Sequence, residues 1–210
     1  MNSSVNLPQQ YLCRDSHFAP WIEHVGEYDL VPTSFDTAFY PLCRSIVYQQ
    51  LSGKAAATIY GRVAQRFGDG DRVDPAKVCS ATTDDLRAAG LSNAKARYVQ
   101  ALAKTDQESG LPSSRELDLQ TDDEVLDALT QHKGVGRWTA QMIMMFWMAR
   151  ADIFAPDDLG LRKGIQKLDD LESLPSIDYM LGRSQVWRPW RTYASWYLWR
   201  MLETDLPLAV

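Results

Sequence analysis

The sequence of 210 residues predicts an all-α fold. Apolar residues recur at helical spacing from Phe18 onward, and these stretches begin at Ser, Thr or Asp and end at Gly, as capped helices do. No segment sustains the alternation of apolar and polar residues that is typical of a half-buried strand. With 45% hydrophobic residues and a mean hydropathy of −0.31, the chain can bury a good core, in one compact unit or in two interlocked lobes.

The first half of the chain reads as short helices joined by turns. Residues 1–15 show no periodicity and are predicted to form a poorly ordered arm. A helix is predicted over residues 18–25, where Gly26 ends it. Residues 107–118, rich in Ser, Pro and charge, are expected to form a loop. Helices between these two regions are predicted to begin after capping residues, namely Ser52, Asp74, Thr82 and Ser92.

Residues 121–163 combine a glycine hairpin with a strongly apolar helix. Thr121 and Glu124 form a capping box that starts a first helix. Residues 133–136, Lys-Gly-Val-Gly, then reverse the chain and use the freedom of glycine at positive φ. A second helix is predicted over residues 137–150. It is apolar around most of its circumference, which indicates a central buried helix, and it is too short for a membrane span.

Two features of this stretch are candidates for chemistry. Main-chain N–H groups at a hairpin and at a helix N-terminus attract an anion such as a DNA phosphate, although ordinary turns between helices also use Gly-x-Gly. Asp157 and Asp158 follow an extended segment that ends in Pro156, and Asp158 falls at the N-cap of the next helix. The residues alone favour a plain capping role for this acidic pair.

Charge and cysteine content limit the function classes. The net charge of −5 argues against duplex binding, which normally relies on basic patches. Residues 133–200 nevertheless hold 10 Lys and Arg against 7 Asp and Glu, so the part with the hairpin is locally basic. Cys13, Cys43 and Cys79 are scattered, which suggests neither a disulfide framework nor a metal site. No signal peptide is recognised, so a cytosolic protein is expected.

Two further runs are unusual. Gln49 and Gln50 lie within an apolar helix, where buried amides need partners, so they are either exposed or bonded in the core. Four of the seven tryptophans lie within residues 187–199. An aromatic stripe at helical spacing is usually part of a core.

These runs together resemble the helix-hairpin-helix (HhH-GPD) DNA glycosylases, and most closely the alkylpurine branch of the 3-methyladenine DNA glycosylase II type. The similarity rests on residues 48–54 (YQQLSGK), on the hairpin and the Asp-Leu-Gly run within 133–163, and on Trp-x-Pro-Trp-Arg-x-Tyr-Ala within 187–199. These motifs occur in the family's order, and the resemblance covers most of residues 18–202.

The resemblance implies a two-lobed helical fold. Residues 16–36 and 137–210 would form one lobe, which follows the arm of residues 1–15. Residues 37–136 would form a central lobe that ends in the helix-hairpin-helix motif, at about residues 122–149. The active site would lie between the lobes.

The same resemblance assigns roles to individual residues. Asp158 would be the catalytic residue, kept ionised by its place at a helix N-terminus, and Asp157 would be structural. Gln50 or Leu51 would fill the gap left by a flipped base, with Gln50 slightly favoured. The base pocket would contain Trp138, Trp199, Met142 and Phe18. The residues expected to contact DNA are Lys133, Gly134, Val135, Gly136, Arg137, Thr139, Gln50, Leu51, Ser52, Lys54 and Lys95.

The expected activity is excision of alkylated purines, N3-methyladenine and N7-methylguanine, in base excision repair. Relatives that also cut the strand use a lysine at the position of Trp138, so a monofunctional enzyme is expected. No cofactor and no metal at the catalytic centre are expected, and the absence of cysteines after Cys79 excludes the iron–sulfur cluster of some relatives. A monovalent cation could bind the hairpin carbonyls of Gly134 and Gly136.

The expected partner is double-stranded DNA with alkylated bases, and the protein is expected to be a monomer that binds no membrane. It would act in the bacterial nucleoid, or in the nucleus of a eukaryote. Two alternatives stay open. One is a non-catalytic protein that binds abasic or distorted duplexes, and the other is a helical protein unrelated to DNA.

Overall fold

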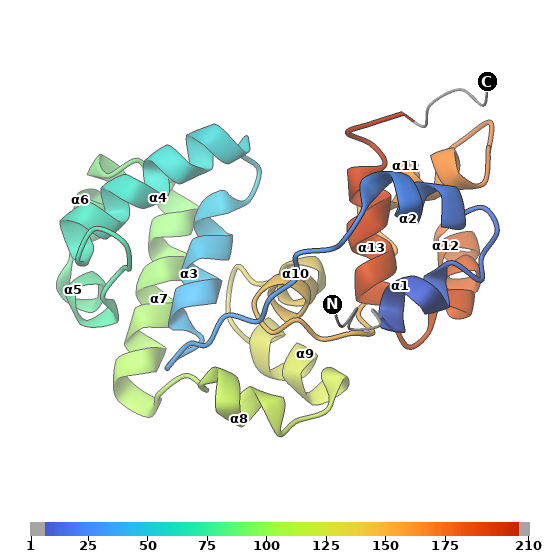
Figure 1. Ribbon diagram of the computed structural model, residues 1–210. Helices are drawn as coiled ribbons and strands as arrows, with labels where there is room; N and C mark the ends of the chain where they lie inside the picture. Colours follow the sequence, from blue (N-terminus) through green and yellow to red (C-terminus); the bar gives the residue numbers. More distant parts are fainter. Residues whose placement is uncertain (1–6, 206–210) are drawn as a thin grey trace, which may run out of the picture. The chain divides into compact units, whose positions relative to one another are not determined.

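The structure, a computed structural model, describes residues 7–205, and its regular elements are helices (Figure 1). Within that range no strand forms, and a single isolated bridge joins Gly68 and Val73. The predicted all-α class is confirmed. The chain divides into two compact units: unit 1 is residues 1–32 and 144–210, and unit 2 is residues 33–143. The second boundary falls inside a helix, later than the predicted boundary at residue 136.

Unit 2 is built around two helices, α3 and α7, which pack against each other (Figure 1). α3 also packs on α4, and α7 also packs on α5 and α6. Leu42, Ile46 and Val99 are fully buried in this core. The helices of unit 2 are α3 (Phe39–Tyr48), α4 (Gly53–Phe67), α5 (Pro75–Ser80), α6 (Thr83–Ala88), α7 (Asn93–Ser109), α8 (Ser114–Asp118), α9 (Asp122–Thr130) and the start of α10 (Arg137–Phe146).

Capping residues set where these helices begin. Thr121 accepts from the N–H of Glu124, and the Glu124 carboxylate accepts from the N–H of Thr121, as predicted. The loop predicted over residues 107–118 is wrong, because α7 continues to Ser109 and α8 follows. Another capping box, between Ser113 and Glu116, starts α8.

Unit 1 surrounds its last helix, α13 (Arg191–Arg200), which contacts α1, α2 and α11 (Figure 1). The buried side chains of α13 include Trp196, Tyr197 and Leu198. The other helices of unit 1 are α1 (Leu7–Leu12), α2 (Ala19–Val25), the end of α10, α11 (Leu159–Leu168), α12 (Ile177–Arg183) and the 3-10 helix η1 (Ser184–Trp187).

The expected N-terminal arm is wrong for residues 7–15. Residues 7–12 form α1, whose Leu12 is buried, and Gln9 Nε2 donates to the Tyr197 hydroxyl at 2.7 Å. Burial of one leucine and a long-range hydrogen bond order this segment without the periodicity of a longer helix. Residues 1–6, which also belong to the predicted arm, lie outside the described residues.

Helix α10 differs from the prediction in its length and in its burial. It ends at Phe146 instead of Arg150, and Ala149 adopts a φ of 50° that does not fit a helix. Trp138 is 45% exposed and Phe146 is 42% exposed, and Met142 between them is half-buried. These three side chains lie four residues apart, so one face of α10 presents an apolar stripe to the surface.

Two glycines allow α11 to lie close to α13. A Cβ atom at Gly164 would lie 2.8 Å from the Leu198 Cβ and 2.9 Å from the Leu198 carbonyl oxygen. A Cβ atom at Gly160 would lie 2.7 Å from the Trp199 ring. The two helices therefore meet along a face that only glycine permits.

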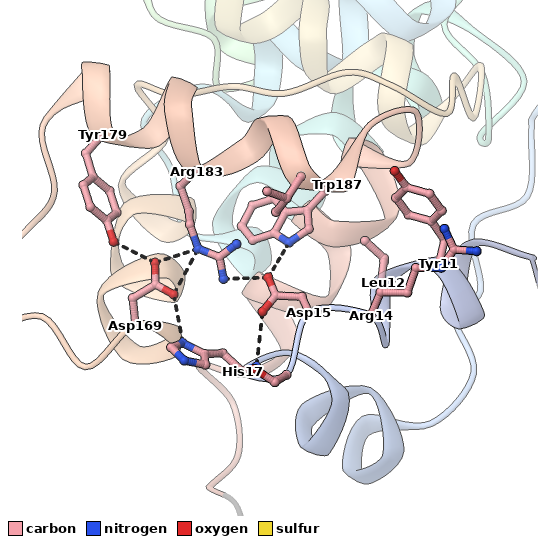
Figure 2. A pocket seen from close by; sticks show the side chains of 11 residues that line it. Tyr11, Leu12, Arg14, Asp15, His17, Asp169, Tyr179, Arg183 and Trp187 are labelled. Atoms are coloured by element: carbon pink, nitrogen blue, oxygen red, sulfur yellow. Dashed lines mark hydrogen bonds and ion pairs between the residues drawn. The ribbon is translucent and has the colours of Figure 1, made fainter.

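A half-buried ion-pair network joins the start of unit 1 to its C-terminal part (Figure 2). The Arg183 guanidinium lies 2.6 Å from Asp15 Oδ2 and 2.9 Å from Asp169 Oδ2, and Trp187 Nε1 donates to Asp15 at 3.0 Å. These groups line a cavity of about 560 Å³. Burial alone would raise the pKa of Asp15, but the bonds from Trp187 and Arg183 outweigh it and lower that pKa.

Replacing Asp15 by Asn should lower the free energy of unfolding by about 1–3 kcal/mol at neutral pH, because a charge-assisted hydrogen bond to Arg183 is lost. The pKa of Asp15 is lower in the folded state. The difference between the two proteins should thus be complete above the ordinary value of 3.8 and should shrink as the pH falls through the folded value. Urea unfolding across this range measures it.

The matched control is Asp170→Asn, which removes a carboxylate from an exposed position of the same unit. It should unfold like the parent protein at every pH. A cost of Asp15→Asn that stays constant down to low pH would contradict the role given to this ion pair.

None of the helices in the described residues is long and apolar enough to cross a membrane.

Candidate functional site

Asp158 begins α11 as its N-cap, as predicted. Its main chain is extended, with a φ of −67° and a ψ of 123°, and its Oδ1 accepts from the Leu161 N–H at 2.7 Å. The same Oδ1 accepts from Trp199 Nε1 at 3.0 Å. Two N–H donors, one from α11 and one from α13, thus orient this carboxylate.

Trp199 reaches Asp158 because Gly160 leaves room for the indole ring. The ring centroid of Trp199 also lies 5.5 Å from that of Phe146, at an interplanar angle of 35°. Unit 1 therefore joins the predicted acid to one of the predicted pocket aromatics. It adds Phe146, at the exposed end of α10, which sequence reasoning placed only within a buried helix.

In unit 2 the hairpin depends on a single glycine. Gly134 adopts a φ of 87°, and a Cβ atom there would lie 2.7 Å from Cγ of the Tyr98 ring. Gly136 has no atom within 4 Å of the position its Cβ would occupy. The predicted need for positive φ is confirmed at Gly134, whereas the fold of unit 2 places no steric demand for glycine on Gly136.

The Gln-Gln pair is resolved into one anchor and one exposed residue. Gln49 Nε2 donates to the Gly134 carbonyl at 2.8 Å and to Thr139 Oγ1 at 3.2 Å, so it joins the turn after α3 to the hairpin. Gln50 is exposed and has a φ of 57°. The sequence indicated that a glutamine amide within an apolar stretch needs a partner. The spacing of the residues did not identify that partner.

A cavity of about 480 Å³ opens beside this turn, entirely within unit 2. Its lining combines the exposed side of the turn with one face of α10. The predicted residues that meet at this cavity are Gln50, Leu51, Trp138, Thr139 and Met142. Tyr48 and Arg44 also line it, and the Arg44 guanidinium lies 4.2 Å above the Tyr48 ring. The sequence analysis did not single out either residue.

Most of the predicted DNA contacts are exposed. They are Lys133, Gly136, Arg137, Gln50, Leu51, Ser52 and Lys54. Ser52 also accepts from the Ala55 N–H at 3.4 Å as the N-cap of α4. Val135 is buried, so only its main chain could face a ligand.

Three predicted site residues need correction. Thr139 is 4% exposed and its hydroxyl accepts from Gln49, so it lies in the protein interior and not on the surface. Lys95 directs its ammonium at main-chain carbonyls of Val47 and Gln49 instead of outward. Phe18 is fully buried against Trp187 and Tyr197, which makes it part of the core of unit 1 and removes it from any pocket surface.

The described residues contain no group of three or more His, Cys, Asp or Glu side chains that could hold a metal ion. The three cysteines are free thiols, and burial raises the pKa of Cys43 to about 12. The Gly134 carbonyl, which was predicted to bind a cation, accepts a hydrogen bond from Gln49.

A hairpin between α9 and α10, followed by an aspartate that caps α11, defines a helix-hairpin-helix protein. Residues 43–191 match the family described as "HhH-GPD superfamily base excision DNA repair protein", and the chain belongs to this family. The predicted membership is confirmed.

Among its relatives, DNA-3-methyladenine glycosylase 1 of Schizosaccharomyces pombe is 33% identical over 76% of this chain and 70% of that protein. The solved structure of the S. pombe 3-methyladenine DNA glycosylase Mag1 with abasic DNA matches with a TM-score of 0.86 and 28% identity, covering 97% of this chain and 100% of that one. A DNA-3-methyladenine glycosidase from Bacillus halodurans matches with a TM-score of 0.82 and 33% identity, covering 97% and 92%. The chain is thus similar to the alkylpurine branch, as expected.

Replacing Gly160 by Ala should displace the Trp199 indole from Asp158, because the added Cβ would lie 2.7 Å from the indole Nε1. Overpacking of this kind costs about 1–3 kcal/mol of stability. The indole N–H resonance of Trp199, followed by nitrogen-15 NMR, should shift strongly.

The matched control is Gly182→Ala, in α12 of the same unit, where a Cβ atom meets nothing within 4 Å. It should leave that resonance in place and stabilise the protein by up to about 1 kcal/mol, since Ala favours a helix over Gly. An unmoved Trp199 resonance in Gly160→Ala would show that the indole does not depend on this glycine.

Proposed function

We propose that the protein is a monofunctional DNA glycosylase that removes alkylated purines, N3-methyladenine and N7-methylguanine, from duplex DNA. The observation that carries the proposal is Asp158, oriented by the Leu161 and Trp199 N–H groups. The names of the relatives support it, because the S. pombe and B. halodurans proteins are called 3-methyladenine enzymes.

Excision of a cationic purine requires little acid catalysis from the protein. A base has to leave the helical stack before it can be excised, at a cost of roughly a few kcal/mol. An alkylated purine is already cationic, so it leaves as a neutral base when the bond between N and C1′ breaks. The sugar then develops positive charge, which the Asp158 carboxylate stabilises. A water molecule then adds its oxygen to C1′ and transfers a proton to a general base. The Asp158 carboxylate would also act as this general base.

Aromatic faces supply the affinity for the cationic base. Trp199, beside Asp158, would stack on it, and such a contact contributes about 0.5–2 kcal/mol. Trp138, which stands where strand-cutting relatives have a lysine, is exposed on α10. An indole cannot form a Schiff base with the sugar, so the proposal includes no strand cleavage. The product is an abasic site, and the reaction needs no cofactor.

The exposed main chain around Gly136 and the cations of Lys133, Arg137 and Lys54 would hold the DNA backbone. The protein would act as a monomer on chromosomal DNA, in the nucleoid or the nucleus.

Replacing Asp158 by Asn should reduce the single-turnover rate of base release at least about 100-fold, because the charge that stabilises the sugar cation is lost. The assay measures free N3-methyladenine and N7-methylguanine released from methylated duplex DNA. Asp157→Asn is the matched control, since this exposed neighbour does not cap α11.

Binding of an abasic duplex separates the outcomes of that experiment. If the parent protein binds the duplex and releases no base, the protein is a DNA-structure binder and not an enzyme. If the parent neither binds nor releases, a helical protein unrelated to DNA is the better reading. Equal rates for the parent and Asp158→Asn would remove Asp158 from the mechanism.

Replacing Gly136 by Ala should weaken binding of an abasic duplex about tenfold while stability is retained, because the methyl group meets no protein atom and would face the DNA. Gly134→Ala should instead unfold more easily, since its methyl group meets Tyr98 at a positive φ. Fluorescence anisotropy and thermal unfolding of both variants test this. Unchanged affinity of Gly136→Ala for the abasic duplex would show that the DNA does not contact residue 136.

A further inference from the structure

The turn between α3 and α4, residues 48–52, carries an exposed residue in a strained conformation. Gln50 adopts a φ of 57°, the left-handed region that non-glycine residues visit at a cost. Strain of this kind persists only where the surroundings hold it. Two side chains hold this turn, one from α7 and one from the turn itself.

The first anchor is Lys95, in the first turn of α7. Its Nζ donates to the Val47 carbonyl at 2.8 Å and to the Gln49 carbonyl at 2.6 Å. The last carbonyls of a helix have no partner inside that helix, so a cation placed there is favoured by both hydrogen bonding and the helix dipole. Burial lowers the pKa of Lys95, as expected for an ammonium partly withdrawn from water.

The second anchor is Gln49 itself. Its amide reaches the Gly134 carbonyl and Thr139 of the hairpin motif, while its own carbonyl is one of the two oxygens bound by Lys95. The residue immediately before Gln50 is therefore fixed through its side chain and through its main chain. Gln50 and Leu51 stay exposed beside the cavity that Trp138 lines.

We propose that Lys95 is a positioning residue: by binding the Val47 and Gln49 carbonyls it keeps Gln50 ready to enter the space that an extruded base leaves in the duplex. The role rests on the proposed function, and it replaces the DNA contact that the family resemblance suggested for this lysine. Lys95 acts through Gln50 and touches neither the DNA nor the base.

The test compares two lysines that bind carbonyls at helix ends. Lys95→Met removes the anchor of the turn, and Lys77→Met removes a similar bond, from Lys77 Nζ to the Gly68 carbonyl at 2.9 Å, at the end of α4. Lys95→Arg keeps a cation at the turn. All are made in the full chain and assayed on methylated duplex DNA, and on a duplex with an abasic analogue beside 2-aminopurine.

Lys95→Met should lower the single-turnover rate of base release about tenfold and should remove most of the 2-aminopurine change at saturating protein, which reports a side chain entering the stack. Affinity for undamaged duplex should change little, because the hairpin is untouched. Lys77→Met should match the parent protein, and Lys95→Arg should retain most of both signals. Equal behaviour of Lys95→Met and Lys77→Met would overturn the proposal.

A measurement without DNA and a second variant separate the role of Lys95 from the proposed function. Amide hydrogen exchange across residues 48–52 needs no DNA and should rise about tenfold in Lys95→Met only; unchanged exchange would refute the anchoring. If Lys95→Met does not fold, Gln49→Leu cuts the second anchor alone and should show the same losses. A parent protein that releases no base defeats the proposed function, whereas the exchange data still decide the role of Lys95.

Discussion

The close approach of α11 to α13 is the constraint on which the site in unit 1 depends. Gly160 and Gly164 lie where any side chain would collide with Trp199 or with the main chain at Leu198. Because the helices meet so closely, the indole N–H reaches the same carboxylate oxygen that caps α11. The start of the helix, the packing of its first turns and the orientation of Asp158 are therefore one arrangement, and a change in any part moves the others.

In unit 2, a polar side chain likewise connects separate segments of the site. Gln49 joins the turn after α3 to the Gly134 carbonyl, so the exposed turn and the hairpin cannot move independently without breaking a hydrogen bond. Gly134 is itself held by its positive φ and by contact with Tyr98. Rigid support beneath an exposed loop is what a binding surface needs, because each residue ordered in advance lowers the entropy lost on binding.

Local signals predicted most of the fold, whereas hydrogen-bond and packing partners far apart in the chain could not be predicted from the sequence. Caps at Ser52, Thr121 and Asp158 set helix starts as expected, because a cap is a property of a few adjacent residues. The capping box of Ser113 and Glu116 that starts α8 is also local. It was missed because the Ser, Pro and charged residues around it are typical of a loop. The destination of Lys95 could not be read from spacing, since its partners are 46 and 48 residues away. Burial of Phe18 likewise depends on Trp187 and Tyr197, from the far end of the chain.

The acidic net charge does not by itself exclude a DNA-binding surface, because salt limits the reach of exposed charges to roughly 10 Å. Some carboxylates lie in capping boxes, where hydrogen bonds from the N-cap residues Ser113 and Thr121 lower the pKa values of Glu116 and Glu124. Others, such as Asp15 and Asp169, are held against Arg183 inside unit 1. A lowered pKa keeps a carboxylate ionised, so Glu116 and Glu124 keep their negative charge, and salt screens the field of such exposed charges beyond roughly 10 Å. The exposed cations beside the hairpin, Lys133 and Arg137, can therefore attract a phosphate even though the chain as a whole is negative.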